Sequence, residues 1–502
     1  MPNQGNESPA PMKLRVARTI KWNIVDKIST QLLYGITGIV LANLLDPADF
    51  GLIGAVLVFQ AFATMFIDSG FSSALIQRKS PTELDYSSVL WFNIAMSVAV
   101  YLILFFCAPV IADLFGGDKR IIGLARVMFL TFIINATAIV QTNRLMKQMN
   151  VRLIAVSNSL GLIAGGAVGI ALALTGYGAW ALVWQAVVLS ACKSLTLWIV
   201  SRWRPLIKFS WHSLMTYRRI GFSMMGATFL SILFQKIYSF FIGNRAGIIP
   251  LGYYTQAEKW STMGVSSLAS ILSSSFLPAL SEYQDEPARF TAASAKMIRF
   301  TSYLLFPSCA MLAVMATPLF HLLFGHKWDG SIILFQLLML KGIFTVLTTL
   351  YQNFIMSRGH ARLIMAGEII RDAVAVVAII ITLPYIALSS PADITEGVAI
   401  FLWGQVAASA VTWVVLLIIG ARLSWRTPWR VLTDSIPYAL LSLLAVIAML
   451  LVKPLFDQPL AILACEAVTG IGIYLLINHL CDSKIQHDVI GYILGRWRQQ
   501  KC

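Results

Sequence analysis

Apolar blocks of about 20 residues, the length that a helix needs to cross a bilayer, recur along the whole 502-residue chain. Only 12% of the residues are charged, whereas a soluble domain carries roughly 25%. No stretch between the blocks is long enough for a separate soluble domain. The sequence therefore predicts an all-α integral membrane protein.

The breaks between the apolar blocks define the predicted transmembrane helices. They contain the Pro, Gly and Asp combinations of loops, for example LLDPADFG, LFGGDKR and FGHKWDG. The blocks predict about 14 helices, at residues 22–44, 51–76, 88–111, 121–142, 153–174, 178–200, 220–242, 252–280, 298–323, 331–356, 362–383, 396–420, 435–452 and 460–480. The first block lacks a small-residue cleavage site, so we expect it to be a retained helix and no signal peptide.

Lysine and arginine are distributed unevenly between the two sets of loops. The set that includes both termini carries about five times as many as the other, which holds only Lys119, Arg120, Arg245, Lys327 and Lys453. By the positive-inside rule both termini are predicted to be cytoplasmic. The net charge of +15 then reflects topology and contact with anionic lipid, and predicts no nucleic-acid partner.

Two segments about 200 residues apart resemble each other. Each begins with basic residues, at Arg18 and Arg218, and continues through a helix, a Pro/Gly turn and a second helix; Phe50-Gly51 matches Leu251-Gly252. An offset of six spans preserves orientation, which predicts two six-helix lobes related by a pseudo-two-fold axis along the membrane normal, plus two C-terminal helices. The predicted parts are a cytoplasmic segment 1–21, an N-lobe 22–200, a basic cytoplasmic linker 201–219, a C-lobe 220–420, two helices within 435–480 and a cytoplasmic amphipathic tail 481–502.

Several familiar kinds of site are not expected. The six cysteines show no pairing pattern and the six histidines are scattered, so neither a disulfide framework nor a metal site is predicted. No phosphate-binding GxxxxGK[ST] loop occurs, and we expect no cofactor. The outer loops are all short, which argues against an outer catalytic domain and therefore against an enzyme.

Polar stripes and charges interrupt the predicted spans. Stripes of Ser and Thr have an ordinary explanation in helix–helix contact, whereas ionisable residues inside a membrane usually mark a pathway or a coupling site. The cationic candidates for a substrate cavity are Lys236, Lys259, Lys341, Arg371 and Lys27. The acidic candidates for proton or ion coupling are Asp68, Asp372, Glu258, Asp26 and Glu368.

The charges sort by depth. Lys236, Lys259 and Lys341 outnumber Glu258 in the outer half, and this surplus suits an anionic cargo that carries phosphate. Lys236 and Lys259 have an alternative explanation, because long side chains can extend to the interface. In the cytoplasmic half, Glu368 and Arg371 are spaced to pair with each other, which would leave Asp372 as a coupling candidate.

Three stretches carry a family resemblance: ANLLDPADFGLIGAVLVFQAFATMFIDSGFSSALIQRK (42–79), IIPLGYYTQAEKW (248–260) and SSSFLPALSEYQDEPARF (273–290). Together they resemble the Wzx-like, colanic-acid-type polysaccharide exporters of the multidrug/oligosaccharidyl-lipid/polysaccharide flippase superfamily. The resemblance implies a fourteen-helix, two-lobe fold in the bacterial inner membrane with a cationic central cavity. It transfers the fold better than site residues; Asp68, within FIDSGF, lies both in a matched stretch and inside a predicted span.

The resemblance implies a flippase that moves an undecaprenyl-pyrophosphate-linked oligosaccharide across the inner membrane for exopolysaccharide, capsule or O-antigen (lipopolysaccharide) synthesis. Its partners would be the polyprenyl-linked substrate, the bilayer, and a polymerase and glycosyltransferases of the same pathway. One alternative is an ion-coupled drug or metabolite antiporter of the same superfamily, which would favour acids over cations. A second alternative is a membrane polysaccharide polymerase or ligase, which would need a sizeable outer loop.

Overall fold

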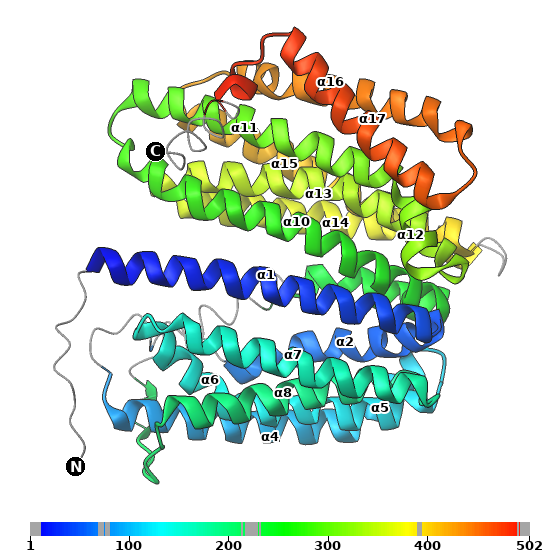
Figure 1. Ribbon diagram of the computed structural model, residues 1–502. Helices are drawn as coiled ribbons and strands as arrows, with labels where there is room; N and C mark the ends of the chain where they lie inside the picture. Colours follow the sequence, from blue (N-terminus) through cyan, green and yellow to red (C-terminus); the bar gives the residue numbers. More distant parts are fainter. Residues whose placement is uncertain are drawn as a thin grey trace, which may run out of the picture. The chain divides into compact units, whose positions relative to one another are not determined.

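Helices account for all regular structure in the residues that the computed structural model describes: 12–68, 81–211, 232–388 and 394–488, with the isolated residues 75, 214, 215, 229 and 491. The α-helices (Figure 1) are α1 (Met12–Leu44), α2 (Pro47–Asp68), α4 (Glu83–Leu114), α5 (Arg120–Met128), α6 (Leu130–Lys147), α7 (Val151–Leu174), α8 (Ala179–Ser201), α10 (Ile248–Glu282), α11 (Pro287–Val314), α12 (Ala316–Phe324), α13 (Asp329–Ser357), α14 (Ala361–Leu388), α15 (Ile394–Leu423), α16 (Pro428–Val452) and α17 (Pro459–Leu480). Short π or 3-10 turns are η1 (Ile242–Ala246), η2 (His326–Trp328) and η3 (Lys453–Leu455).

Twelve helical segments of the described residues are long and apolar enough to cross a membrane. They coincide with twelve of the predicted spans. The predicted span 252–280 lies within α10, which is not among the twelve, and much of the predicted span 220–242 lies outside the described residues. The all-α membrane class is therefore confirmed, whereas the count of fourteen stays a prediction.

A glycine stripe on α7 sets its contact with α8. Gly161, Gly165 and Gly169 recur at every fourth position and face the α8 backbone. A Cβ atom on Gly165 would lie 2.6 Å from the carbonyl oxygen of Gln185, and one on Gly161 would lie 2.8 Å from that of Leu189. Small residues let membrane helices approach closely, so the two backbones are in direct contact.

The first turns of α2 and α10 cross at a second close contact. A Cβ atom on Gly51 would lie 1.9 Å from the carbonyl oxygen of Ile248, and one on Gly252 would lie 1.9 Å from that of Pro47. The contact is reciprocal, because both partners are related by the same offset of 201 residues. This symmetry agrees with the repeat of about 200 residues that the sequence predicts.

The chain forms two compact units, Met1–Gly252 and Tyr253–Cys502. The helix over residues 232–241 belongs to the first unit, and the η1 turn that follows packs on the end of α4. The Phe240 and Phe115 rings lie 5.8 Å apart, and Asn244 Nδ2 donates to the Leu114 carbonyl oxygen at 2.6 Å. The predicted lobe boundary at 201–219 stays a prediction. The two compact units are defined by packing, whereas the two lobes were predicted from a repeat in the sequence.

The second unit is built on α11, α13 and α15, which share an apolar core that includes the buried Leu350 and Leu416. The last two helices, α16 and α17, join it through three tyrosines. Tyr438 and Tyr474 place their rings 5.9 Å and 5.5 Å from that of Tyr303, and Tyr474 donates its hydroxyl hydrogen to the Tyr303 carbonyl oxygen at 2.9 Å. The trailing helices therefore pack on α11 through aromatic and hydrogen-bonded contacts.

The chain after α17 begins the predicted tail helix. Residues 484–488 are helical, Ile485 is buried, and Asp488 Oδ2 lies 2.6 Å from Lys296 Nζ of α11. The hydrogen bond from Lys296 holds the pKa of the Asp488 carboxyl below its ordinary value. Most of the remaining tail lies outside the described residues.

Candidate functional site

An ion network on α14 gathers three of the predicted site residues. The Arg371 guanidinium contacts the Glu368 carboxylate and lies 2.8 Å from Asp372 Oδ1. Gln352 of α13 donates Nε2–H to Glu368 Oε1 at 2.9 Å. The expected Glu368–Arg371 pair is present, but Asp372 does not stay outside it. Since two carboxylates offset one guanidinium, Arg371 offers little free positive charge to a phosphate.

A second polar cluster lies between α1, α7 and α8 in the first unit. Asn158 Nδ2 of α7 donates to Asp26 Oδ1 of α1 at 3.1 Å. Lys193 of α8 interacts electrostatically with Asp26. The neighbouring Lys27 is exposed on α1. Asp26, Asn158 and Lys193 thus bring an acid, an amide and a cation together from three helices.

The three outer-half lysines, Lys236, Lys259 and Lys341, are all half-buried. Lys236 belongs to the first compact unit, and the other two belong to the second. Lys259 Nζ lies 5.5 Å from the centroid of the Trp260 ring, a distance at which a cation is attracted to the aromatic face. Glu258 is also half-buried. Extension of Lys236 and Lys259 to the interface stays an alternative to a cavity position.

The helices that carry Lys259 and Lys341 lie side by side. α10 and α13 run parallel, because contacts between them advance together along both chains: Tyr253 with Gly330, Val265 with Gly342, and Ser273 with Asn353. In this register Lys341 stands about five residues further along than Lys259, which is roughly 8 Å along the helix axes. Two lysines therefore stand on neighbouring parallel helices of the second unit.

Lys193 and Glu466 are among the intramembrane charges that the sequence analysis did not select. Lys193 lies inside a predicted span and was not selected, although it carries the same signal as the lysines that were. Glu466 of α17 is 0% exposed, and no side chain among the described residues hydrogen-bonds its carboxylate oxygens. Both were detectable as charges in apolar runs. Asp68, the remaining candidate, ends α2, and its side chain lies outside the described residues.

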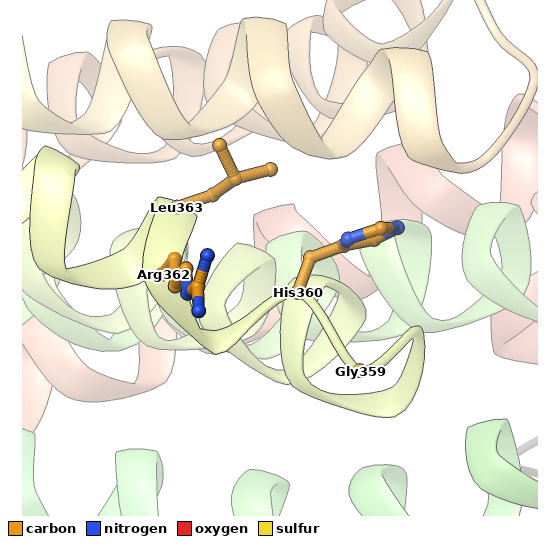
Figure 2. A pocket seen from close by; sticks show the side chains of 4 residues that line it. All are labelled: Gly359, His360, Arg362 and Leu363. Carbon is orange, nitrogen blue, oxygen red and sulfur yellow. The ribbon is translucent and has the colours of Figure 1, made fainter.

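A half-open pocket of about 500 Å³ lies where α13 turns into α14. Figure 2 shows its lining, which consists of Gly359, His360, Arg362 and Leu363. All four residues come from one turn and the start of one helix. The pocket includes none of the intramembrane candidates, so we assign it no role in binding the substrate.

The histidines are less scattered than their sequence positions suggest. His321 and His326 lie close to Asp329. One potential metal-ligand atom from each of the three residues lies within 4.8 Å of the other two. No such cluster was expected from the sequence. The chain reverses at Gly325, and this turn brings the end of α12 against the start of α13.

The twelve membrane-length helices of the described residues define a multi-pass membrane protein. The structure is similar to that of the lipid II flippase MurJ in an inward closed conformation, with a TM-score of 0.73 and 17% identity over 94% of this chain and 100% of that chain. An inward-facing multidrug resistance transporter of the MATE family is less similar, with a TM-score of 0.59 and 16% identity over 80% and 98% of the two chains.

The family follows from the sequence match. Residues 40–333, more than half of the chain, match the family described as polysaccharide biosynthesis protein, and the chain belongs to it. The succinoglycan biosynthesis transport protein ExoT of Rhizobium meliloti is 28% identical over 66% of this chain and 68% of its own length. The lipopolysaccharide biosynthesis protein WzxC of Escherichia coli is 23% identical over 68% and 70% of the two chains. The predicted family resemblance is confirmed.

Proposed function

We propose that this protein is a flippase that carries an undecaprenyl-pyrophosphate-linked oligosaccharide from the inner to the outer leaflet of the bacterial inner membrane. The translocated unit would serve exopolysaccharide, capsule or O-antigen synthesis. Both termini would lie in the cytoplasm, as the basic loops predict. A polymerase and glycosyltransferases of the same pathway would be its functional partners.

One observation carries the proposal: a member of the polysaccharide biosynthesis family has a MurJ-like fold over 94% of its length. ExoT is named as a transport protein of succinoglycan biosynthesis, and MurJ is named as a flippase for lipid II. A sugar unit on a lipid carrier is the cargo that fits both names. The surplus of outer-half lysines supports an anionic head group on that cargo.

The mechanism we propose is alternating access. Lys236, Lys259 and Lys341 would attract the pyrophosphate, while Lys27 would contribute positive charge in the cytoplasmic half. Arg371 would act within its own ion network, holding Glu368 and Asp372 in place rather than binding phosphate directly. Access to one side and then the other would move the head group while the polyprenyl chain stays in lipid.

Alanine at Lys236 or Lys341 is expected to reduce polysaccharide export about tenfold or more, because one charge-assisted contact to phosphate contributes ~1.5–3 kcal/mol. Insertion into the membrane should not change. The measurement is surface polysaccharide from a deletion strain that expresses each variant at matched level, with Lys453→Ala of the η3 turn as the control. Wild-type export from both variants would show that these lysines serve only the interface.

The acidic residues provide the candidates for coupling to an ion gradient: Asp68, Asp372, Glu258, Asp26 and Glu368. Asparagine at Asp68 is expected to lower export severalfold at unchanged protein level, because an amide cannot release or bind a proton. Export assayed with and without a proton-gradient uncoupler is the measurement. If the Asp68→Asn variant exports normally and responds to the uncoupler as the wild type does, Asp68 is not the coupling residue.

The decisive experiment distinguishes the three candidate activities: flippase, antiporter, and polymerase or ligase. Purified protein in proteoliposomes should move a fluorescent polyprenyl-pyrophosphate oligosaccharide from one leaflet to the other, and protein-free liposomes should not. An ion-coupled antiporter, the alternative that the MATE-like similarity keeps open, would instead accumulate a cationic dye against its gradient. A polymerase or ligase would lengthen or transfer the oligosaccharide, which mass analysis of the recovered lipid would detect.

A further inference from the structure

Three potential metal ligands converge at the junction of α12, η2 and α13, away from the residues proposed to bind the cargo. His321 is in the last turn of α12, His326 begins η2, and Asp329 begins α13. His321 Nε2 lies 2.8 Å from Asp329 Oδ1, and His326 Nδ1 lies 3.7 Å from Asp329 Oδ2. The two imidazole rings are 4.1 Å apart between centroids. Three different elements thus bring two imidazoles and one carboxylate to a single point.

These separations suit a transition-metal ion. Ligand atoms about 2.0–2.1 Å from a tetrahedral zinc ion lie roughly 3.3 Å from one another. The two His–Asp separations, 2.8 Å and 3.7 Å, fall on either side of that value but involve different oxygens of Asp329. One ligand atom from each of the three residues lies within 4.8 Å of the others, so closing around an ion needs a shift of up to about 1.5 Å. The His326 side chain is 82% exposed and is therefore free to make that shift.

The turn that carries the ligands is firmly anchored. Phe324 and Trp328 lie between the ligands in sequence, and each is at most 2% exposed. The Phe324 ring lies 5.3 Å from that of Trp260, and the Trp328 ring lies 6.3 Å from that of Tyr253. Gly325 turns the chain with φ of +79°, a conformation that suits glycine. A metal site needs such a rigid support to hold its ligands in place.

A purely structural role explains only part of the arrangement. Asp329 at the start of α13 and His321 at the end of α12 would each complement a helix dipole, and they would hydrogen-bond without a metal. That role leaves His326 with only a longer contact, 3.7 Å from its Nδ1 to Asp329 Oδ2, while its ring packs against the ring of His321. A nitrogen of each ring lies within 4 Å of the same carboxylate, and neutral imidazole is the form that binds metals.

We propose that His321, His326 and Asp329 form a binding site for a divalent transition-metal ion, with Zn²⁺ the best match to an imidazole and carboxylate ligand set. Two imidazoles and one carboxylate leave a fourth position for water. The bound ion would tie the end of α12 to the start of α13. The site lies in a loop that the positive-inside rule places outside the cytoplasm, so external metal would reach it.

The test uses the full-length protein, purified without a polyhistidine tag and treated with chelator. Zn²⁺ added to the wild type should bind at one ion per chain and raise the melting temperature, and Co²⁺ should give visible d–d absorption. His326→Ala and Asp329→Asn, both at exposed side chains, should each weaken binding by at least ~10-fold and remove the thermal shift. Neither variant should lower the metal-free melting temperature strongly.

Two matched controls decide the interpretation. Lys327→Ala changes a charge in the same turn, and His360→Ala removes a histidine elsewhere; both should bind Zn²⁺ as the wild type does. The proposal is overturned if His326→Ala and Asp329→Asn retain wild-type affinity, or if His360→Ala loses as much affinity as they do. The outcome is independent of transport, because none of the measurements uses the cargo.

Discussion

Alanine in place of Gly252 is expected to destabilise the protein by about 1–3 kcal/mol or more and to abolish export. The new Cβ atom would lie 1.9 Å from the carbonyl oxygen of Pro47. A backbone oxygen cannot turn aside as a flexible side chain can, so the first turns of α2 and α10 would have to separate. The measurement is the melting temperature of the purified variant in detergent, together with surface polysaccharide from cells.

The same helix supplies the control. A Cβ atom on Gly264 of α10 would meet nothing within 4 Å, so Gly264→Ala should keep or raise the melting temperature, since alanine favours a helix by ~1 kcal/mol over glycine. Gly51→Ala should resemble Gly252→Ala because the contact is reciprocal. Equal melting temperatures for Gly252→Ala and Gly264→Ala would show that this crossing is not closely packed.

Alanine in place of Arg371 is expected to produce the other large effect. It would leave Glu368 and Asp372 without the cation between them, and removing one partner of a buried ion pair costs ~3–5 kcal/mol. The side chains of Arg371 and Glu368 are 29% and 30% exposed, so we expect a loss at the lower end of that range. The melting temperature and the amount of protein in the membrane fraction measure the loss.

A neutral triple variant separates stability from transport. Replacing Arg371, Glu368 and Asp372 by Gln, Gln and Asn keeps the shapes of the two acidic side chains, shortens residue 371 and removes all three charges, which should restore most of the melting temperature. Arg362→Ala, an exposed cation on the same helix, is the control for charge alone. If the triple variant regains stability but not export, the charges serve transport. If Arg371→Ala is as stable as Arg362→Ala, the ion network does not stabilise the protein.

Hydropathy and loop chemistry were sufficient to predict most of the fold. The twelve segments found in the structure coincide with predicted blocks because a lipid environment demands long apolar helices. Helix 232–241 was predicted to open the second lobe, which stays a prediction. Its packing at the end of α4 depends on ring and glycine contacts that sequence hydropathy does not register.

The site was predictable in composition but not in pairing. A charge in an apolar run is visible in the sequence, and Lys193 and Glu466 stand in such runs as plainly as the selected lysines do. The ion pair between Arg371 and Asp372 could not be predicted in this way, because it depends on the direction of the side chains and not on their spacing. Spacing at i and i+3 identified the Glu368–Arg371 pair, but residues one position apart on a helix are not expected to pair.

The cluster of His321, His326 and Asp329 could not be found from a search for regular ligand spacing. Its residues lie on a helix end, a short turn and a helix start, so no single periodicity relates them. The buried anchors Phe324 and Trp328 between them give the turn its shape. A search for histidines and carboxylates around a glycine turn would have selected this stretch.

The glycine stripe of α7 fixes the distance between α7 and α8. The backbones of α7 and α8 already touch at Gly161 and Gly165, so they cannot come closer, and parting would open a gap along the whole stripe. Spin labels at the exposed Leu160 of α7 and Leu195 of α8 should therefore keep one separation throughout a transport cycle. Changes measured from either label to the second unit would then report only the movement of that unit.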